Sequence, residues 1–378
     1  MLRELETYRR LPVDFVSAEG CELVLADGKR VLDLYGGHCV NTLGAGDTAL
    51  GDELSAQWQS LSFATNLIDH APRAEFLAAF GALTPAARDW RVFCGNSGAE
   101  ANENALKAAL AATGRDTVVA FEGAFHGRTS AAAAVSDRKS GFPAAPFNVV
   151  RVPFGNTELA QQAIDSSVGA VILEPIQSLA GVIDPPDGFL EALREACDAS
   201  GAALIFDEVQ TASGRLGVAT AAEHFGVLPD IYTTAKGAGG GLPIGLTVIE
   251  ESWAQRLPGG LFGSTFGGGP YVLAAAAEVA RRVAEPAFLE NVVATSDALI
   301  AGALCGPVKG IRGAGLLLGL ELEDGYKAGD VRDALLAKGV LVGTCDDPSV
   351  LRLSPPLVLT PDAAKRLAIA FDSLGVTA

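Results

Sequence analysis

The sequence predicts an α/β protein in which a large domain with a mostly parallel sheet is joined to a smaller α+β domain. Three observations support this fold class. About half (49%) of the 378 residues are hydrophobic, strand-like runs alternate with helical patterns through the middle of the chain, and the pattern changes near residue 309. We expect residues 1–45 to belong to the small domain, 46–284 to form the large domain and 285–378 to complete the small domain.

The N-terminal third is predicted to contain a β-hairpin, a glycine loop, a helix, a strand and a second helix. Asp27-Gly28 is a turn signal between two apolar runs. Ser97-Gly-Ala-Glu100 has the spacing of a capping box at a helix start. In order, these segments are residues 20–34, 35–38, 50–61, 92–94 and 97–112.

The middle of the chain alternates strands with helices at the spacing of βαβ units, which is typical of a parallel sheet. A helix at residues 187–201 leads into the fourth of these strands. The expected strands are residues 117–121, 149–152, 170–173, 202–206 and 231–234.

The C-terminal part reads as helices followed by a smaller α+β unit. An alanine-rich helix covers residues 270–284, and Glu285-Pro286 separates it from another helix. Beyond these, the expected strands are residues 316–322 and 350–353, and the expected helices are 331–338 and 361–374.

Charge and composition restrict the class of function. The net charge is −17 and the isoelectric point is near 4.7, which argues against nucleic acid and anionic membranes as partners. The six cysteines have no CxxC spacing, so neither a disulfide framework nor a metal site is expected. The N-terminus has no apolar signal core, and no run of about 18 apolar residues could span a bilayer. We therefore expect a soluble, cytoplasmic protein that acts on small molecules.

Lys236 is the first candidate for chemistry. It follows the buried-strand pattern of residues 231–234 and precedes a glycine-rich run that ends at Gly241. A desolvated lysine at a strand end can lose its proton and attack a carbonyl to form a Schiff base. A solvated lysine in a flexible loop is the simpler explanation of the Lys-Gly pair by itself.

Asp207 follows the continuously apolar strand at residues 202–206. In an open α/β sheet, groups just beyond the carboxyl end of a strand bind ligands. A carboxylate there needs a cationic partner, so Asp207 is a candidate counter-ion for a protonated ring nitrogen. Gln210, one turn later, could donate a hydrogen bond to a ring oxygen. A helix cap or a surface position is the alternative for Asp207.

Ser97, Gly98 and Ala99 end one strand and open a helix. Backbone N–H groups and the helix dipole converge there, which suits a phosphate group. A capping box alone also explains Ser97 and Glu100. Thr265 lies in a second glycine-rich segment, residues 263–268, which could complete a phosphate site or be a plain loop.

Phe125, Arg128 and Arg352 are candidates for holding a flat ring and carboxylates. Phe125 and Arg128 follow the strand at residues 117–121, where a core phenylalanine and a surface arginine are the ordinary alternatives. Arg352 lies between apolar residues on a predicted strand, a position that usually provides a bound anion or a buried partner. Asp207, the helix end at residues 97–99 and Lys236 would supply the three contacts that pyridoxal phosphate requires: charge on the ring nitrogen, an anion cradle and a covalent tether.

The order of these motifs along the chain resembles that of the class III pyridoxal-phosphate aminotransferases, and of the acetylornithine aminotransferase group within them. The resemblance extends nearly from end to end. The segment Tyr35-Gly-Gly-His38 is similar to the short bacterial branch that includes succinylornithine-type enzymes. The other matching motifs are Asn96–Glu103, Ala124–Thr129, Glu174–Gln177, Phe206–Thr211, Thr234–Gly237 and Leu351–Pro356.

The resemblance implies a fold-type-I transferase with a mostly parallel seven-stranded sheet in the large domain. It also implies a homodimer whose active sites lie at the subunit interface, with pyridoxal 5'-phosphate as the cofactor. Lys236 would be the covalent anchor, Asp207 would pair with the ring nitrogen, Phe125 would stack on the ring and Gln210 would lie near its phenolic oxygen.

The same resemblance implies where the phosphate and the substrates would bind. Thr265 would reach the phosphate of the neighbouring subunit, and Tyr35 would belong to the substrate site. Arg128 would bind the α-carboxylate of an N-acylated amino-acid donor, and Arg352 the α-carboxylate of 2-oxoglutarate or glutamate. The phosphate itself would be held by Ser97, Gly98 and Ala99.

The implied reaction moves the terminal amino group of acetyl- or succinylornithine to 2-oxoglutarate, giving the semialdehyde and glutamate, in arginine biosynthesis. The alternatives are another class III ω-aminotransferase acting on 4-aminobutyrate, ornithine or a carrier-linked lysine precursor, an aminomutase, or a non-catalytic binding protein of the same fold.

Two positions in this sequence differ from the family pattern and bear on the substrates. Leu179 stands where many relatives carry a glutamate that pairs with the arginine matching Arg352, and Gly44-Ala-Gly-Asp47 lacks the histidines that usually follow the glycine loop.

Overall fold

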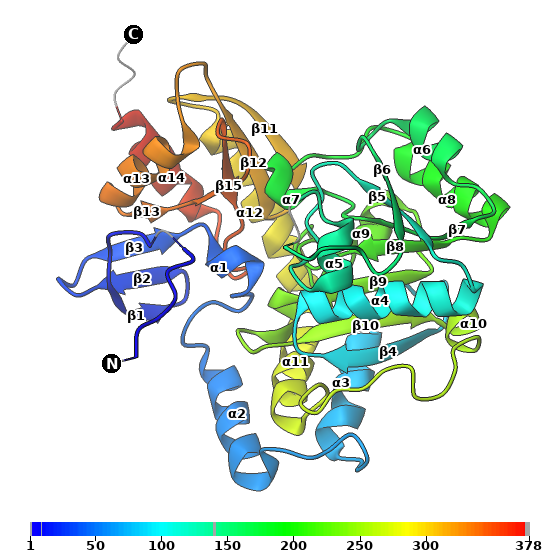
Figure 1. Cartoon of the computed structure of the whole chain (residues 1–378). Coiled ribbons are helices and arrows are strands. Elements are labelled where there is room, and N and C mark those ends of the chain that lie inside the picture. The colour runs from blue at the N-terminus through cyan, green and yellow to red at the C-terminus, as the bar shows by residue number, and fades with distance from the viewer. Residues whose placement is uncertain (1, 9, 139–140, 375–378) are drawn as a thin grey trace.

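A computed structural model describes residues 2–8, 10–138 and 141–374 of the chain. Figure 1 shows a large lobe built on an extended sheet and a smaller lobe that contains both ends of the chain. The first three strands, coloured blue, lie beside the orange and red C-terminal elements. Within the described ranges, no helix combines the length and apolar character that crossing a bilayer requires.

The large lobe is organised around a seven-stranded sheet with the order β4-β10-β9-β8-β7-β5-β6. Strands β5 to β9 pair in parallel, and β10 runs antiparallel to both of its neighbours. This confirms the predicted, mostly parallel sheet. The strands are β4 (Trp90–Gly95), β5 (Thr117–Phe121), β6 (Asn148–Val152), β7 (Val168–Leu173), β8 (Ala203–Asp207), β9 (Ile231–Ala235) and β10 (Gly245–Glu250).

Alternate residues of the central strands enter two different cores, because successive side chains of a strand point to opposite faces. On β8, Leu204 and Phe206 pack on one face, while Ala203 and Ile205 pack on the other. The first face is covered mainly by α2 (Thr48–Leu61), α3 (Ala71–Gly81), α6 (Thr157–Ala163), α8 (Phe189–Ser200) and α11 (Pro270–Val283). The second face is covered by α4 (Gly98–Thr113), α5 (Ser130–Val135) and α10 (Glu251–Ala254).

Short elements connect this sheet to the smaller lobe. Figure 1 shows α1 and α7 between the two lobes. Leucine-rich strands and helices of the smaller lobe share a separate core. The remaining short elements are α1 (Gly36–Cys39), α7 (Ser178–Gly181), α9 (Ala221–Phe225) and the 3₁₀ turn η1 (Lys236–Gly239), and α9 and η1 lie between consecutive strands of the large sheet.

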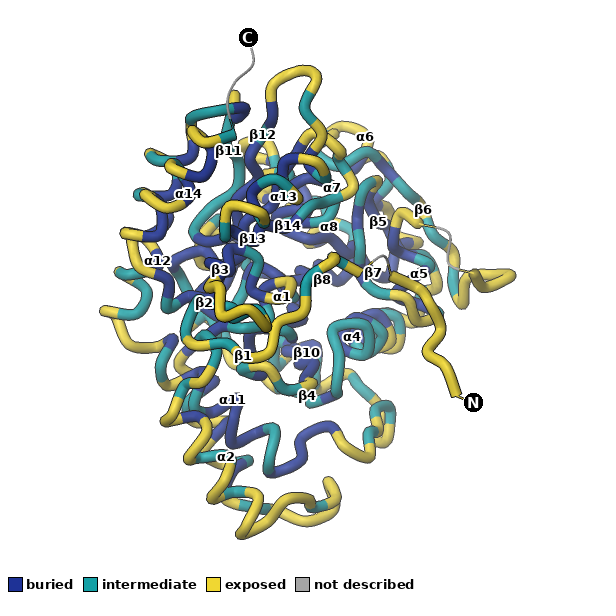
Figure 2. Tube along the Cα trace, turned by 90° about the vertical axis from the view of Figure 1, so that its left-hand side faces the viewer, coloured by how far each residue is buried: buried dark blue, intermediate teal, exposed yellow. Residues whose placement is uncertain are grey.

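The smaller lobe contains two four-stranded sheets, ordered β1-β2-β3-β13 and β11-β12-β15-β14. Figure 2 shows outer helices of this lobe with exposed faces, whereas its strands range from the mostly exposed β1 to the fully buried β15. Its helices are α12 (Pro286–Ala303), α13 (Ala328–Ala337) and α14 (Asp362–Asp372). Its strands are β1 (Phe15–Glu19), β2 (Glu22–Leu25), β3 (Arg30–Asp33), β11 (Val308–Ala314), β12 (Leu317–Leu322), β13 (Val340–Leu341), β14 (Gly343–Thr344) and β15 (Val350–Leu353).

The elements expected from the sequence occur, with ends shifted by a few residues, but several elements, including helix α3, were not predicted, and one loop differs from the expectation. Strands β1, β10, β11, β13 and β14 were not predicted, and β10 is the one that separates β4 from the parallel strands. The expected glycine loop at residues 35–38 is a tight turn in which both Gly37 and His38 have left-handed backbone angles. A residue pattern cannot reveal this handedness, because it depends on contacts with β15 and the segment after it.

Candidate functional site

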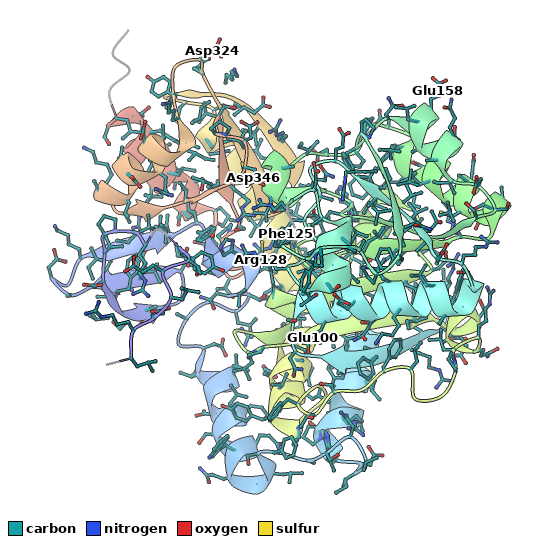
Figure 3. The ribbon with its side chains drawn as sticks, viewed as in Figure 1. Glu100, Phe125, Arg128, Glu158, Asp324 and Asp346 are labelled. Atoms are coloured by element: carbon teal, nitrogen blue, oxygen red, sulfur yellow. The ribbon has the colours of Figure 1, made fainter. Side chains whose placement is uncertain are left out.

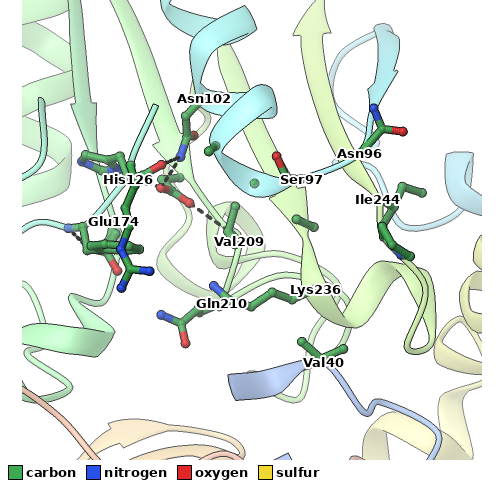
Figure 4. A pocket seen from close by; sticks show the side chains of 18 of the residues that line it. Val40, Asn96, Ser97, Asn102, His126, Glu174, Val209, Gln210, Lys236 and Ile244 are labelled. Carbon is green, nitrogen blue, oxygen red and sulfur yellow. Dashed lines mark hydrogen bonds and ion pairs between the residues drawn. The ribbon is translucent and has the colours of Figure 1, made fainter. Parts of the chain in front are cut away.

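A cavity of about 480 Å³ opens at the carboxyl ends of the parallel strands. Its lining includes Glu174, which follows β7, Asp207, which ends β8, and Lys236, which follows β9. Figure 4 shows Ser97, Gln210 and Lys236 turned toward this space from three different segments. The cavity thus lies where open α/β sheets bind their ligands.

Lys236 begins a 3₁₀ turn immediately after β9 and has a positive φ of 42°. The glycine that follows it allows a close approach: a Cβ on Gly237 would lie 2.6 Å from Thr42 Oγ1, which donates a hydrogen bond to the Gly237 carbonyl at 2.9 Å. Burial lowers the pKa of Lys236, although Cys39 and the carboxylates of the site oppose the effect. A lowered pKa increases the fraction of neutral amine, the form that acts as a nucleophile.

Asp207 ends β8 and is held by donors on two other segments. Its Oδ2 accepts hydrogen bonds from Asn102 Nδ2 and His126 Nδ1, each at 2.7 Å. Thr233 Oγ1 donates in turn to Asn102 Oδ1 at 2.7 Å, so the amide cannot rotate freely. Within the protein, the carboxylate therefore contacts an amide and an imidazole. His126 Nε2 is buried without a hydrogen-bond partner among the described residues.

The N-terminus of α4 forms one wall of the cavity. Ser97 caps the helix by accepting from the Glu100 N–H at 3.2 Å, and Glu100 accepts from the Asn96 N–H at 2.7 Å, which confirms the predicted capping interaction. The first N–H groups of a helix lack intrahelical acceptors. At Gly98 a Cβ would lie 3.0 Å from a methyl group of Val209, so the missing side chain keeps the space open.

Phe125 and Arg128 lie at the rim of the cavity, between the two lobes (Figure 3). The Phe125 N–H donates to Glu174 Oε1 at 2.8 Å, which positions the ring. Arg128 lies 5.7 Å from the centre of that ring and donates to the Tyr8 hydroxyl at 2.7 Å. Burial, with a smaller contribution from Asp207, raises the pKa of Glu174 to about 7.

Arg352 lies on β15 and is fully buried next to the cavity. Its Nη1 donates to Ser178 Oγ at 3.0 Å and to Gln210 Oε1 at 3.4 Å. Its guanidinium carbon is 5.8 Å from the centre of the Tyr35 ring. Because Gln210 lines the cavity, it connects Arg352 to the space beside Lys236.

The structure brings most of the predicted site residues together. Tyr35 and Arg352 form a second layer behind Gln210, whereas Thr265 is exposed in the loop before α11 and does not line the cavity. The predicted residues that line the cavity are Ser97, Gly98, Ala99, Phe125, Arg128, Asp207, Gln210 and Lys236.

Several residues of the site were not singled out in the sequence. Asn102 and His126 could have been noticed, because each lies in a motif that was quoted for its neighbours. Glu174 is likewise the first residue of a quoted motif. Val209 and His38 also lie in quoted motifs, Phe206–Thr211 and Tyr35-Gly-Gly-His38, but only folding brings Val209 to the cavity wall and His38 to Arg352. No group of three or more potential metal-ligating side chains occurs in the part of the chain that the structure describes.

The sequence matches one protein family and several relatives over most of its length. The family described as aminotransferase class-III matches residues 6–374. An acetylornithine aminotransferase of Streptomyces coelicolor is 42% identical over 367 residues, covering 94% of this chain and 89% of the relative. That of Mycolicibacterium smegmatis is 39% identical over 381 residues, covering 99% of this chain and 96% of the relative.

Comparisons of structure lead to the same family. N-acetylornithine aminotransferase of Stenotrophomonas maltophilia superimposes with a TM-score of 0.82 at 30% identity, covering 97% of both chains. Ornithine aminotransferase of Toxoplasma gondii gives a TM-score of 0.88 at 26% identity, covering 98% of this chain and 92% of its own. The family match spans almost the whole sequence and the relatives are matched over most of their length, so the chain belongs to the class-III aminotransferase family.

Proposed function

We propose that the protein moves the terminal amino group of acetylornithine or succinylornithine to 2-oxoglutarate, in the arginine biosynthesis of its cell. The products are the semialdehyde of the donor and glutamate. The observation that carries the proposal is the cavity itself, in which Lys236 and the held carboxylate of Asp207 face one space. Relatives that bear the name acetylornithine aminotransferase support the choice of donor.

The cofactor of this reaction is pyridoxal 5'-phosphate, and the cavity has the groups it requires. An amine, a carboxylate, an aromatic face and a helix N-terminus without side-chain bulk all line one space. When bound, pyridoxal phosphate supplies an electron sink for carbanion chemistry. We assign Ser97, Gly98 and Ala99 to its phosphate and Phe125 to a face of its ring.

Lys236 and Asp207 would do the central chemistry. The lowered pKa of Lys236 favours the neutral amine, which can tether the cofactor and, once displaced by substrate, take up and return a proton at the reacting carbon. Asp207 would keep a pyridine nitrogen protonated. Its bonds from Asn102 and His126 fix the carboxylate in place, so its charge needs no reorganisation during the reaction.

Gln210 and two arginines would orient the remaining polar groups. Gln210 accepts hydrogen bonds from Cys39 and Arg352 through its Oε1 atom. Its amide nitrogen would therefore donate to the phenolic oxygen of the ring. Arg128 at the rim would bind the α-carboxylate of the donor. Arg352, behind Gln210 and beside Tyr35, would bind a carboxylate of 2-oxoglutarate, because a guanidinium pairs with a carboxylate through two parallel bonds.

We further infer that the protein is a homodimer in the cytoplasm. Large apolar side chains are exposed on α2, on the segment after it and on the loop before α11, including Trp58, Phe63, Leu67 and Phe266. Clustered apolar exposure of this kind marks a protein interface. Thr265 lies in that same loop, so it would reach the phosphate of the partner subunit.

A panel of amino donors tests the function. With 2-oxoglutarate as acceptor, we expect kcat/KM for acetylornithine or succinylornithine to exceed that for free ornithine and for 4-aminobutyrate at least about tenfold, because the cavity lining includes the apolar side chains of Val40, Leu242 and Ile244, on which an acyl group could pack. Faster turnover of free ornithine or 4-aminobutyrate would assign another ω-aminotransferase. Activity without any oxo acid would indicate an aminomutase.

Lys236→Ala is the control for chemistry at this site. Its steady-state turnover should fall by about three orders of magnitude or more, because no other lysine among the described residues lines the cavity. Turnover close to that of the unchanged protein would overturn the assignment of Lys236. An unchanged protein that stays colourless and inactive after cofactor addition would instead favour a non-catalytic binding role.

A further inference from the structure

Arg352 is a buried cation with neutral partners. Its acceptors among the described residues are a hydroxyl on Ser178, the amide oxygen of Gln210 and the Nδ1 atom of His38, which lies 2.9 Å from Nη2. Its Nε is buried without a partner in the described part of the chain. The residue after Ser178 is Leu179, so no carboxylate follows there to neutralise the guanidinium. A charge buried in this way is stabilised when an anion arrives.

The contact with Arg352 determines the protonation state of His38. A guanidinium has only donors, so Nδ1 of His38 must be the acceptor and must lack a proton. The ring is then the neutral form with hydrogen on Nε2. His38 as a whole is exposed, but partial desolvation of its ring beside Arg352, together with the charges of Arg352, Lys236 and Arg128, lowers the pKa of His38 to about 4, which agrees with a neutral ring at physiological pH.

The backbone holds His38 in this position at a cost in free energy. Four successive residues from Gly36 to Cys39 have positive φ values between 58° and 66°, although His38 and Cys39 carry side chains. The first residue of the turn must be glycine, because a Cβ on Gly36 would lie 2.4 Å from the carbonyl oxygen of Ser354 on the segment after β15. Unfavourable left-handed residues persist at functional sites when the surrounding structure determines them.

The next contacts explain what determines the turn. Asp33 Oδ1 accepts hydrogen bonds from the N–H groups of Tyr35 and Gly36 at 2.9 and 2.8 Å. Ser354 Oγ donates to the Tyr35 carbonyl at 2.7 Å. The turn is therefore fixed to the end of the strand that carries Arg352, and the Tyr35 hydroxyl lies 2.5 Å from Nε2 and 2.7 Å from Nδ1 of His38.

We propose that His38 is a specificity-determining residue that occupies the carboxylate position of Arg352 as a neutral ligand and is displaced by the incoming carboxylate of the acceptor. This inference rests on the proposed function, in which Arg352 binds 2-oxoglutarate. Because His38 satisfies the guanidinium without cancelling its charge, the full attraction for a dicarboxylate is retained. An internal carboxylate would compete with the substrate at the same atoms, whereas the imidazole yields its hydrogen bond to a stronger, charge-assisted one.

The test compares His38→Asp with His38→Asn. In both side chains an oxygen can take the place of Nδ1, and both residues tolerate left-handed backbone angles, so the pair differs in charge alone. The probe is glutarate, a five-carbon dicarboxylate without an oxo group, titrated calorimetrically into the cofactor-loaded protein. We expect the Asp variant to raise both the Kd for glutarate and the KM for the oxo-acid acceptor about tenfold or more, and the Asn variant to stay within about threefold of the unchanged protein.

Three outcomes would overturn the inference. The first is an equal rise of the Kd for glutarate in the Asp and Asn variants, and the second is an unchanged Kd in the Asp variant. The third is a KM for the amino donor that rises as much as the KM for the oxo-acid acceptor. The donor's KM should change less because its carboxylate is assigned to Arg128. Glutarate binding needs no turnover, so it tests the role of His38 even if the amino donor proves to be a different amine. The identity of the donor is decided separately, by the panel of donors.

A measurement on the unchanged protein covers the case in which a variant does not fold. The chain has four histidines, so ¹⁵N-histidine spectra are simple to assign with single substitutions. At pH 7, His38 should show an unprotonated Nδ1 and a protonated Nε2, and its signals should shift when glutarate is added. A doubly protonated ring, or signals that glutarate leaves unchanged, would contradict displacement from Arg352.

Discussion

Lys236 shows how a single side chain acquires its chemistry from its surroundings. Burial lowers its pKa, while Cys39, Asp207 and Glu174 act in the opposite direction. Desolvation is the largest of these effects, so the net change favours the neutral amine, which is the form that can react.

A prediction about pH follows for this residue. A lowered pKa means that the neutral amine appears at lower pH than in a free lysine side chain, whose pKa is about 10.4. The rate at which cofactor-free protein captures pyridoxal phosphate should therefore rise with pH and reach half its maximum below that value. Stopped-flow absorbance after mixing measures the rate. A midpoint at or above the value for free lysine would contradict the effect of burial, and Lys236→Ala supplies the baseline without capture.

Asp207 shows a limit of reasoning about single residues. Its position after a strand made it a candidate ligand-binding carboxylate, and the need for a compensating partner was predicted. The partners, Asn102 and His126, come from α4 and from the segment after β5. They lie 105 and 81 residues away in sequence, so no local pattern connects them to Asp207.

Among the elements, the unpredicted strand β10 has a direct effect on the site. It crosses behind the start of α4, and a Cβ on Gly245 would lie 2.0 Å from the carbonyl oxygen of Ser97. The contact is between backbone atoms, which cannot move aside as a flexible side chain can. The position of the helix N-terminus therefore depends on a glycine in a neighbouring strand.

Gly245→Ala should displace the N-terminus of α4. We expect a loss of unfolding free energy of about 2 kcal/mol or more from the overpacking, and weaker cofactor binding because the N–H groups of Gly98 and Ala99 shift. Thermal unfolding and titration with pyridoxal phosphate measure the two effects. The matched control is Gly329→Ala in α13, where a Cβ meets no atom within 4 Å. Similar behaviour of the two variants would show that the contact with Ser97 is unimportant.

At the scale of the whole molecule, the site lies between two lobes and is proposed to be completed by a second subunit. Thr265 is exposed and absent from the cavity lining, whereas the apolar surface around it remains uncovered in the single chain. In the proposed homodimer the loop before α11 would lie against the partner, which would explain both the exposed Thr265 and the uncovered apolar surface.

Mixing two inactive variants tests the shared site. Lys236→Ala disables its own site, and Thr265→Asp would repel phosphate in the partner's site. In an equal mixture after subunit exchange, half of the dimers are hybrids with one complete site, so about a quarter of full activity should return. If Thr265 served its own subunit, the mixture would stay inactive. As a control, the Thr265→Ser variant should be active without mixing. Light scattering of the unchanged protein should give the mass of a dimer.

Much of the fold was predictable, because strand and helix patterns are local. Apolar runs followed by helical periodicity predicted the parallel strands β5 to β9, and Glu285-Pro286 predicted the start of α12. Strand β10 was missed because the glycines and proline before it resemble an extended loop. Its antiparallel pairing with β4 and β9 is a property of the sheet, and no residue pattern in β10 records it.

The family and the large sheet could be predicted from the sequence alone, and so could the residues that are proposed to carry the chemistry, because each of these predictions depends on residue type and order. The tertiary structure alone decided which residues hold Asp207, that Gly245 must make room for Ser97, and that Arg352 meets a neutral imidazole from a left-handed turn. These depend on distances between segments far apart in the chain. Lys236 could thus be identified from its motif, whereas the pairing of His38 with Arg352, 314 residues away, required the folded molecule.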